Sequence, residues 1–301
     1  MLIRNILLFV VILLFSLISF SYIRDRNEIK SRENTISYKI DNTIDFPFYE
    51  KQNFIPKVIH RNYGLKDDKS TLEKYSVVFE KTKKICPEFK EEIIFGKKSM
   101  EEFILKYYNQ DVLDIIELLN YNYAACVSDI LRLLVIYAKG GIYLDIKSHT
   151  VEDLTPELEK YNDKFLCSYF CSIPFIFTGW THLPPYGEIS NWFFAAPKGH
   201  PIVRELILQS LSNVKNAYLE KEKFKNGRPY ILSLTGPYMF TKVIKNSKFL
   251  NQVKLLGTFS LKNIEFSGWR GKLKKETREI NNSKIQNKTH WKHLQEPLFK
   301  I

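Results

Sequence analysis

The 301-residue chain contains little cysteine. Four cysteines are present, none in a CxxC pair, and no histidine lies at the spacing of a zinc finger. A structural zinc site is therefore not expected, and we expect the cysteines to be buried thiols. Internal repeats and low-complexity tracts are also absent, while hydrophobic residues make up 45% of the chain and charged residues 26%. This composition excludes a disordered chain, a collagen-like repeat and a polytopic membrane protein.

Negative charge is scarce in the last quarter of the chain. The formal net charge is +12, and residues 221–301 contain 18 lysines and arginines against 5 acidic residues, whereas residues 1–50 contain 6 of each. A basic surface favours a partner that carries phosphate, such as a nucleic acid, an anionic membrane or a small ligand. The densest cluster lies at residues 272–278. Because charge runs of this kind are usually solvated faces, we expect no nucleic-acid partner.

Long apolar runs are absent except at the N-terminus. Residues 5–23 (NILLFVVILLFSLISFSYI) contain no charged side chain, and about 17–25 apolar residues span a bilayer. A cleaved signal peptide is the alternative, but its apolar core is usually about 7–15 residues long and ends at a small-residue cleavage site. We therefore expect a single-pass transmembrane anchor at residues 1–23, a polar stem at residues 24–50 and one folded domain at residues 51–301.

Strand and helix patterns alternate along the rest of the chain. β-branched and aromatic runs predict strands, and 3.6-residue periodicity or capping patterns predict helices. The expected strands are residues 57–60, 92–95, 142–146, 165–170 and 192–196; the expected helices begin at Ser99 and cover residues 111–120, 123–139, 201–214 and a segment from Pro237. This alternation predicts an α/β fold, in which ligands bind at the carboxyl ends of the strands.

The helix expected at residues 123–139 is apolar around most of its circumference. Asp129 and Arg132 nevertheless lie on it, three residues apart and away from the main apolar stripe. One interpretation is an ion pair on a solvated face. The other is a buried pair, which needs partners, and a ligand is one kind of partner. The pair Gly140-Gly141 ends the helix, and Gly140 suits the left-handed C-terminal position.

The strand expected at residues 142–146 presents polar side chains at its carboxyl end. Because side chains alternate along a strand, Tyr143, Asp145 and Lys147 share one face while apolar residues occupy the other. An aromatic ring, a carboxylate and an ammonium group thus meet where α/β folds bind their ligands.

The segment from Ala124 to Asp145, AACVSDILRLLVIYAKGGIYLD, joins these features in one string. It resembles the sugar-binding signature of the DXD-motif glycosyltransferases, in particular family 32 with its initiation-type mannosyltransferases, inositol-phosphoceramide mannosyltransferases and α-1,4-sugar transferases. Residues 55–60 (IPKVIH), 191–201 (NWFFAAPKGHP) and 235–237 (TGP) resemble the opening strand and later blocks of the same family.

The resemblance implies a GT-A fold, a Rossmann-like nucleotide-sugar-binding sheet with helices on both faces. It implies a retaining glycosyltransferase that moves a hexose (mannose, galactose, glucose or GlcNAc) from a UDP- or GDP-sugar to a glycan or glycolipid acceptor. A non-catalytic nucleotide-sugar- or glycan-binding module of the same fold is the alternative. In a eukaryote, the resemblance and the expected anchor together indicate a catalytic domain in the Golgi or ER lumen.

The resemblance also implies roles for individual residues. Asp129 and Arg132 would hold the hydroxyls of the donor sugar and its diphosphate, and Tyr143 and Asp145 would line the ribose and metal side. Asp129, Arg132 and Asp145 are the expected catalytic residues. Tyr63 matches a position where an aromatic ring stacks on the donor base, and an ordinary loop aromatic is the alternative.

Two further segments contribute candidates. Thr289 and Trp291 resemble an element that closes over the donor diphosphate, although a loop aromatic flanked by histidines explains them equally. Glu188 and Asn191 fall in the segment expected to contact the acceptor, without an assigned role. The basic C-terminal quarter then fits a phosphate-bearing donor and a nearby membrane better than a nucleic acid.

The chain departs from the family at the DXD motif itself, which reads Asp145-Ile-Lys147. The second carboxylate of the motif usually binds Mn²⁺ or Mg²⁺, and a lysine cannot replace it as an oxygen ligand. Three readings stay open: the Lys147 ammonium replaces the charge of the metal, Asp145 still holds a metal with help from His290 or His293, or the chain binds its ligand without turnover.

Overall fold

The computed structural model describes residues 36, 38–63, 65, 72–73, 75–169, 188–258, 264–266 and 294–300. The expected anchor at residues 5–23, the basic cluster at residues 272–278 and the candidates Thr289, His290 and Trp291 lie outside these residues. Within the described ranges, no helix combines the length and the apolar composition needed to cross a membrane.

The described chain forms alternating strands and helices. The strands are β1 (Val58–Tyr63), β2 (Lys90–Phe95), β3 (Gly141–Leu144), β4 (Ser148–Thr150), β5 (Phe165–Tyr169), β6 (Phe193–Ala196), β7 (Val253–Thr258) and β8 (Ile264–Phe266). The helices are α3 (Ser76–Ile85), α4 (Gly96–Tyr107), α5 (Gln110–Glu117), α6 (Ala124–Lys139), α7 (Thr155–Lys160), α8 (Pro201–Leu219), α9 (Ile231–Leu234) and α10 (Pro237–Asn246). The expected α/β class is confirmed.

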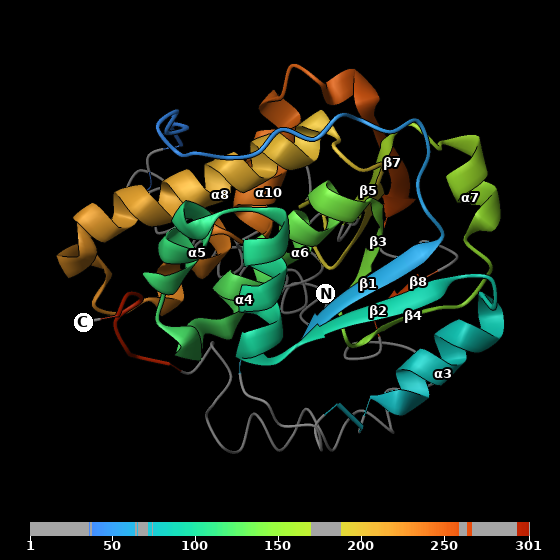
Figure 1. The fold of residues 1–301 in the computed structure, drawn as a ribbon, viewed down its shortest axis with the longest axis horizontal. Coiled ribbons are helices and arrows are strands. Elements are labelled where there is room, and N and C mark those ends of the chain that lie inside the picture. The colour runs from blue at the N-terminus through green and yellow to red at the C-terminus, as the bar shows by residue number, and fades with distance from the viewer. Residues whose placement is uncertain are drawn as a thin grey trace, which may run out of the picture.

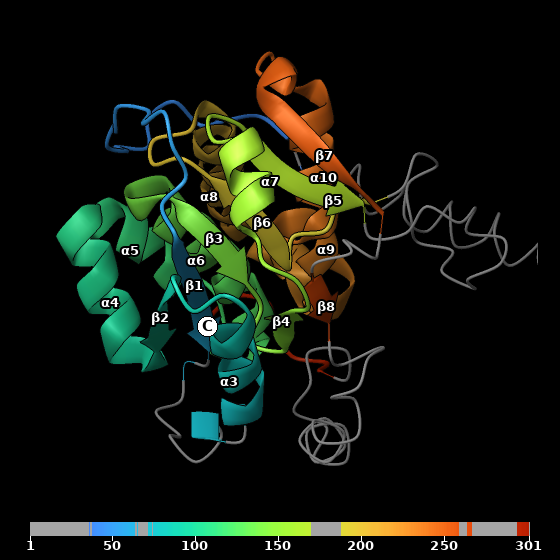
Figure 2. The same cartoon turned by 90° about the vertical axis from the view of Figure 1, so that its right-hand side faces the viewer.

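Six of the strands form one mixed sheet in the order β2-β1-β3-β6-β5-β7, and β4 pairs with β8 in a separate ribbon. β1 lies parallel to β2 and β3, and β5 lies parallel to β7, whereas β6 runs antiparallel to both of its neighbours. Helices α4, α5, α6, α8 and α10 cover one face of the sheet, and α3 and α7 lie on the other (Figures 1 and 2). The largest apolar core lies between the sheet and the first group of helices.

Several predicted boundaries need correction. α4 begins at Gly96 rather than at Ser99, whose hydroxyl donates to the carbonyl oxygen of Phe95 instead of capping a helix. α5 ends at Glu117, earlier than expected, and α8 continues beyond residue 214 to Leu219, with Ala217 the last buried residue on it. β3 ends at Leu144, so Asp145 follows the strand instead of lying within it.

Gly140 and Gly141 allow the chain to pass from α6 into β3. Their φ angles are +70° and +105°, which side-chain-bearing residues rarely adopt. The ψ of Gly140 is −175°, so its conformation is not the left-handed helical one expected from the sequence. A Cβ atom on Gly141 would lie 2.6 Å from the carbonyl oxygen of Val58, so glycine also permits the close approach of β1.

Residues 38–50, expected to belong to a stem, instead pack on the folded domain. Ile44 and Phe46 are buried in the largest core. The Asp41 carboxylate forms an ion pair with Lys215 on α8, with 2.7 Å between Oδ2 and Nζ. The backbone N–H of Asp41 donates to the Ser212 hydroxyl. Figure 1 shows this segment running along α8 before the chain enters β1. Residues 38–50 thus contribute side chains to the core of the domain expected at residues 51–301.

The three described cysteines, Cys86, Cys126 and Cys167, are buried and unpaired. Burial raises the pKa of Cys126 to about 12, so this thiol stays protonated. Among the described cysteines, the expectation of buried thiols is confirmed.

Candidate active site

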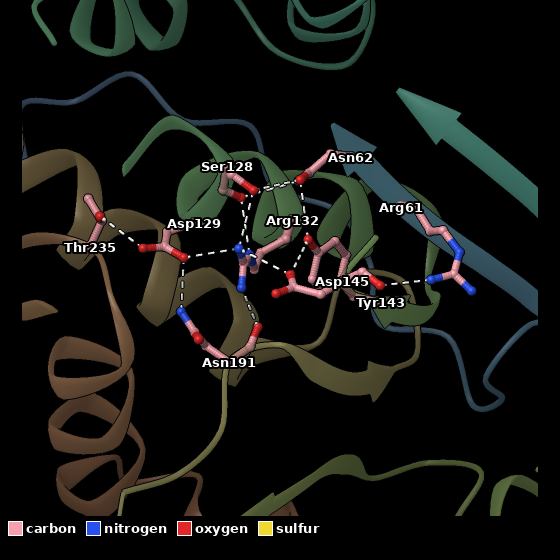
Figure 3. Close-up of polar contacts among 9 residues, drawn as sticks. All are labelled: Arg61, Asn62, Ser128, Asp129, Arg132, Tyr143, Asp145, Asn191 and Thr235. Carbon is pink, nitrogen blue, oxygen red and sulfur yellow. Dashed lines mark hydrogen bonds and ion pairs between the residues drawn. The ribbon is translucent and has the colours of Figure 1, made fainter. Parts of the chain in front are cut away.

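The candidate site lies where β3 ends, between the middle of α6 and the segment that leads into β6. Figure 3 shows nine residues joined there by hydrogen bonds and ion pairs: Arg61, Asn62, Ser128, Asp129, Arg132, Tyr143, Asp145, Asn191 and Thr235. They come from β1, α6, β3 and the turn after it, the segment before β6 and the residues before α10. The site thus forms at the carboxyl end of β3, as the α/β alternation predicts.

Asp129 projects from α6 into a buried polar environment. Its side chain is 8% exposed, which excludes the ion pair on a solvated face. Oδ1 accepts a hydrogen bond from Asn191 Nδ2 at 2.9 Å, and Oδ2 accepts one from the Thr235 hydroxyl at 3.3 Å. Burial raises the pKa of Asp129 to about 7, despite the opposing charge of Arg132. This carboxyl group therefore changes protonation near neutral pH.

Arg132, one turn further along α6, connects both halves of the site. Nη2 lies 3.1 Å from Asp129 Oδ1 and 3.4 Å from Asp145 Oδ1. Nη1 donates to the Asn191 carbonyl oxygen at 2.6 Å, and the guanidinium lies 4.8 Å from the centre of the Tyr143 ring. Burial alone would lower the pKa of Arg132, but Tyr143 and the two carboxylates raise it above its ordinary value. Arg132 is a fixed cation.

Asp145 occupies the turn that follows β3. The Tyr143 hydroxyl donates to Asp145 Oδ1 at 2.8 Å and lies 3.2 Å from Asn62 Oδ1. The Asp145 side chain is 26% exposed, in contrast to the buried Asp129. Asp145 is therefore the more exposed of the two carboxyl groups that pair with Arg132.

The buried side chain of Arg61 binds the backbone of the same turn. Its side chain is completely buried, and Nη1 donates to the carbonyl oxygens of Asp145 and Ser148, both at 2.7 Å. Nε pairs with Glu91 on the neighbouring strand, and Nη2 donates to Thr82 on α3. A guanidinium with this many fixed partners sets the conformation of the turn that carries Asp145 and Lys147.

The described residues do not fit a divalent cation. Asp145 supplies one carboxylate, already paired with Arg132, and Lys147 stands where the motif would supply the second. Among the described side chains, no group of three His, Cys, Asp or Glu residues comes close enough to hold a metal ion. His290 and His293, the helpers considered from the sequence, lie outside the described residues.

The other sequence-based candidates have definite positions where they are described. Tyr63 ends β1 and packs between Tyr75 and Phe95, with ring centres 5.6 and 6.3 Å away. Lys147 lies in the turn between β3 and β4. Their roles toward a donor, like those of Thr289 and Trp291, stay predictions.

Four contributors were not expected from the sequence: Arg61, Asn62, Ser128 and Thr235. The Ser128 hydroxyl donates to Asn62 Oδ1 at 2.6 Å and lies 3.2 Å from Arg132 Nη2. Ser128 directly precedes Asp129 in the segment from Ala124 to Asp145, so the sequence motif already pointed to its position. Asn62 and Arg61 carried no local signal, because only the parallel pairing of β1 with β3 brings them to the site.

Comparison with known proteins agrees with this geometry. Residues 65–164 match the family described as "Glycosyltransferase sugar-binding region containing DXD motif". This range contains Asp129, Arg132 and Asp145, so the resemblance seen in the sequence is confirmed for the region that carries the candidate site.

The relatives include glycosyltransferases of fungi. The chain is 24% identical over 233 residues to the initiation-specific alpha-1,6-mannosyltransferase of Candida albicans, covering 70% of this chain and 57% of the relative. It is 30% identical over 142 residues to the enzyme of the same name from Schizosaccharomyces pombe, covering 46% and 34%. The chain therefore spans only part of the length of these relatives. The solved structure of the PaToxG glycosyltransferase matches with 22% identity and a TM-score of 0.44, covering 76% of this chain and 83% of that one.

Proposed function

We propose that this chain is a glycosyltransferase of GT-A fold. It transfers a hexose, with retention at the anomeric carbon, from a UDP- or GDP-sugar to a glycan or glycolipid acceptor. The observation that carries this proposal is the cluster of the buried Asp129 and Arg132 with the partly exposed Asp145 at the carboxyl end of β3, inside the matched sugar-binding region. The mannosyltransferase names of the relatives favour mannose as the transferred sugar.

The cluster suits a sugar bound through its diphosphate. Carboxylates accept hydrogen bonds from sugar hydroxyls, and a guanidinium donates paired hydrogen bonds to phosphate oxygens. Transfer needs a leaving diphosphate whose developing charge is stabilised and an acceptor hydroxyl held near the anomeric carbon. In this proposal Arg132 and Lys147 provide the positive charge, and Asp129 and Asp145 orient the sugar.

The cationic groups also offer an alternative to the metal that DXD enzymes use. A carboxylate-to-lysine change at the second motif position alters the local charge by two units, in the direction that favours a bound diphosphate. We therefore propose that Lys147 takes the place of the metal charge and that turnover is independent of Mn²⁺ and Mg²⁺.

A donor screen tests the proposal. The full chain is incubated with UDP-glucose, UDP-galactose, UDP-GlcNAc and GDP-mannose, with Mn²⁺ or with EDTA, and both nucleotide binding and release of free sugar are measured. One donor is expected to be bound and slowly hydrolysed, with activity retained in EDTA. Asp129→Ala should abolish donor binding while the circular dichroism spectrum stays unchanged.

The outcomes separate the competing readings. Activity that disappears in EDTA would refute the replacement of the metal by Lys147. Binding without hydrolysis or transfer would favour the non-catalytic module. Neither binding nor hydrolysis of any donor would refute the glycosyltransferase, and unchanged binding by Asp129→Ala would refute the assignment of the site.

We further propose that residues 1–23 anchor the chain in a membrane, with the catalytic domain in the Golgi or ER lumen of a eukaryotic host. The uncharged run at residues 5–23 supports the anchor.

A further inference from the structure

The hydroxyl group of Tyr75 is buried beside the candidate site and has no role in the network already described. Tyr75 directly precedes α3, and its side chain is completely buried. Its hydroxyl oxygen has no hydrogen-bond partner among the described residues. Buried polar groups are almost always hydrogen-bonded, because desolvation without a partner is unfavourable. A ligand that supplies the missing hydrogen bond accounts for such a group.

Contacts place Tyr75 at the turn that follows β3. Tyr75 belongs to a small apolar cluster that includes Ile146, the middle residue of the Asp-Ile-Lys motif. Tyr63, at the carboxyl end of β1, packs against the same cluster, and its ring centre lies 5.6 Å from that of Tyr75. Burial raises the pKa of Tyr75, and the nearby Tyr63 and Asp145 raise it further. The hydroxyl therefore stays protonated and is able to donate a hydrogen bond.

The strand ends indicate where the nucleoside of a donor lies relative to its diphosphate. β2, β1 and β3 are neighbours and run parallel, so their carboxyl ends meet at one edge of the sheet, outside which ligands bind. On its other side, β3 pairs with the antiparallel β6. Arg132 and Asp145, the proposed diphosphate and sugar residues, lie where β3 ends (Figure 3). A nucleotide that continues from there along the parallel strand ends reaches the end of β1, where Tyr63 and Tyr75 lie.

We propose that the Tyr75 hydroxyl donates a hydrogen bond to an oxygen atom of the donor nucleoside. This inference rests on the proposed glycosyl transfer, because it requires a nucleotide-diphosphate sugar as the donor. The acceptor oxygen belongs either to a hydroxyl group of the ribose or to a carbonyl group of the base, and both accept from a phenolic O–H. Tyr75 thereby fixes the orientation of the nucleoside at the end of β1.

Tyr75→Phe in the full chain tests this role, because the substitution removes a single oxygen atom. Since that oxygen has no partner among the described residues, its loss should leave the melting temperature unchanged or raise it. Calorimetric titration is carried out with UDP and GDP, and the affinity for the nucleotide that the wild type binds more tightly should fall about tenfold, the size of one lost hydrogen bond. The affinity for pyrophosphate, which contains no nucleoside, should not change.

Tyr108→Phe is the matched control. The Tyr108 hydroxyl is also buried, but it donates to the carbonyl oxygen of Leu134 at 2.6 Å. The ring packs against Phe46 and Phe103 in the largest core. Loss of this hydroxyl should therefore lower the melting temperature and leave the affinity for the nucleotide unchanged, the reverse of the result expected for Tyr75→Phe.

Deoxynucleotides identify the acceptor oxygen. The wild type and Tyr75→Phe are titrated with the ribonucleotide and with its 2′-deoxy and 3′-deoxy forms. If the acceptor is a ribose hydroxyl, the wild type should bind one deoxy form about tenfold more weakly, and Tyr75→Phe should bind that form as tightly as the ribonucleotide. If the acceptor is a base carbonyl, Tyr75→Phe should lose the same factor with all three nucleotides.

The contrary outcomes are distinct. If the wild type binds and hydrolyses a donor and Tyr75→Phe binds the nucleotide equally well, the role of Tyr75 is refuted while the glycosyltransferase stands. An equal loss of affinity for pyrophosphate, or a fall in melting temperature with unchanged affinity for the nucleotide, would show that Tyr75 is a structural residue. A wild type that binds neither UDP nor GDP contradicts the proposed function, and the role of Tyr75 with it.

Discussion

Asp129 and Asp145 share one cation, Arg132, yet their surroundings differ. Asp129 is 8% exposed and bonded to Asn191 and Thr235, whereas Asp145 is 26% exposed and bonded to Tyr143. Burial disfavours the charged form of a carboxyl group and raises the pKa of Asp129 to about 7. Its negative charge is thus present only above neutral pH, while Arg132 keeps its charge throughout.

This difference predicts a pH dependence of donor binding. A raised pKa means that Asp129 is neutral below about pH 7 and ionised above it. An ionised carboxylate accepts stronger hydrogen bonds from sugar hydroxyls than a carboxylic acid does. The affinity for GDP-mannose or UDP-glucose should therefore rise up to about tenfold between about pH 6 and about pH 8, since each pH unit below a pKa costs about one factor of ten in the ionised form.

Calorimetric titration of the full chain across this range measures the effect. Asp129→Asn keeps the shape of the side chain and removes its ionisation, so the rise centred near neutral pH should disappear. Persistence of the same rise in Asp129→Asn would assign the titration to another group.

At the scale of elements, the turn between β3 and β4 depends on a side chain from β1. Arg61 binds two carbonyl oxygens of this turn and reaches α3 and β2 with its remaining nitrogens. Neither β3, with four residues, nor β4, with three, is long enough to fix the turn by strand pairing alone. The position of Asp145 therefore depends on contacts made across three elements.

Arg61→Met should lower the free energy of unfolding by about 3 kcal/mol, because it leaves two buried carbonyl oxygens and Glu91 without their partner. Lys57→Met is the matched control, directly before the same strand. The pair of Lys57 with Glu88 is exposed, so its loss should cost less than about 1 kcal/mol. Urea denaturation of both variants tests the contrast, and equal losses would contradict the role of Arg61.

At the scale of the whole molecule, segments near both described ends of the chain pack into the core on the side of the sheet that α4, α5, α6, α8 and α10 cover. Residues 38–50 run along α8 (Figure 1), with Phe46 5.6 Å from Tyr137 between ring centres. Near the other end, Leu298 and Phe299 are buried in the same core, and the Tyr123 hydroxyl donates to the Glu296 carbonyl oxygen. Segments distant in sequence thus complete the core beneath α6, the helix that carries Asp129 and Arg132.

This packing predicts different results for two truncations. Deletion of residues 1–35 removes the proposed anchor and should yield a chain that melts like the full one and no longer sediments with membranes. Deletion of residues 1–50 also removes the buried side chains of Ile44 and Phe46, each worth about 1.5–3 kcal/mol when buried, and should lower the melting temperature by several degrees or abolish folding.

Thermal melting and carbonate extraction of membranes compare the two. Equal melting temperatures of the two truncated chains would show that residues 38–50 form a stem and do not stabilise the domain. Membrane retention of the chain without residues 1–35 would refute the anchor.

The sequence by itself determined the class of fold and the centre of the site. Hydrophobic periodicity located α6, the glycine pair marked its end, and the alternating strand placed Tyr143 and Asp145 on one face, because these are local consequences of backbone geometry. The string from Ala124 to Asp145 also supported the family, since its polar residues lie on α6, on β3 and in the turn directly after β3.

Only the tertiary structure decided what surrounds that centre. Arg61 and Asn62 reach it through the pairing of β1 with β3, and Asn191 and Thr235 through segments far along the chain. Whether Asp129 and Arg132 lay in solvent or in a buried network was open in the sequence, as was the packing of residues 38–50 on α8. The physical reason is the same in each case: burial and partner choice arise from contacts between distant segments, which no local pattern contains.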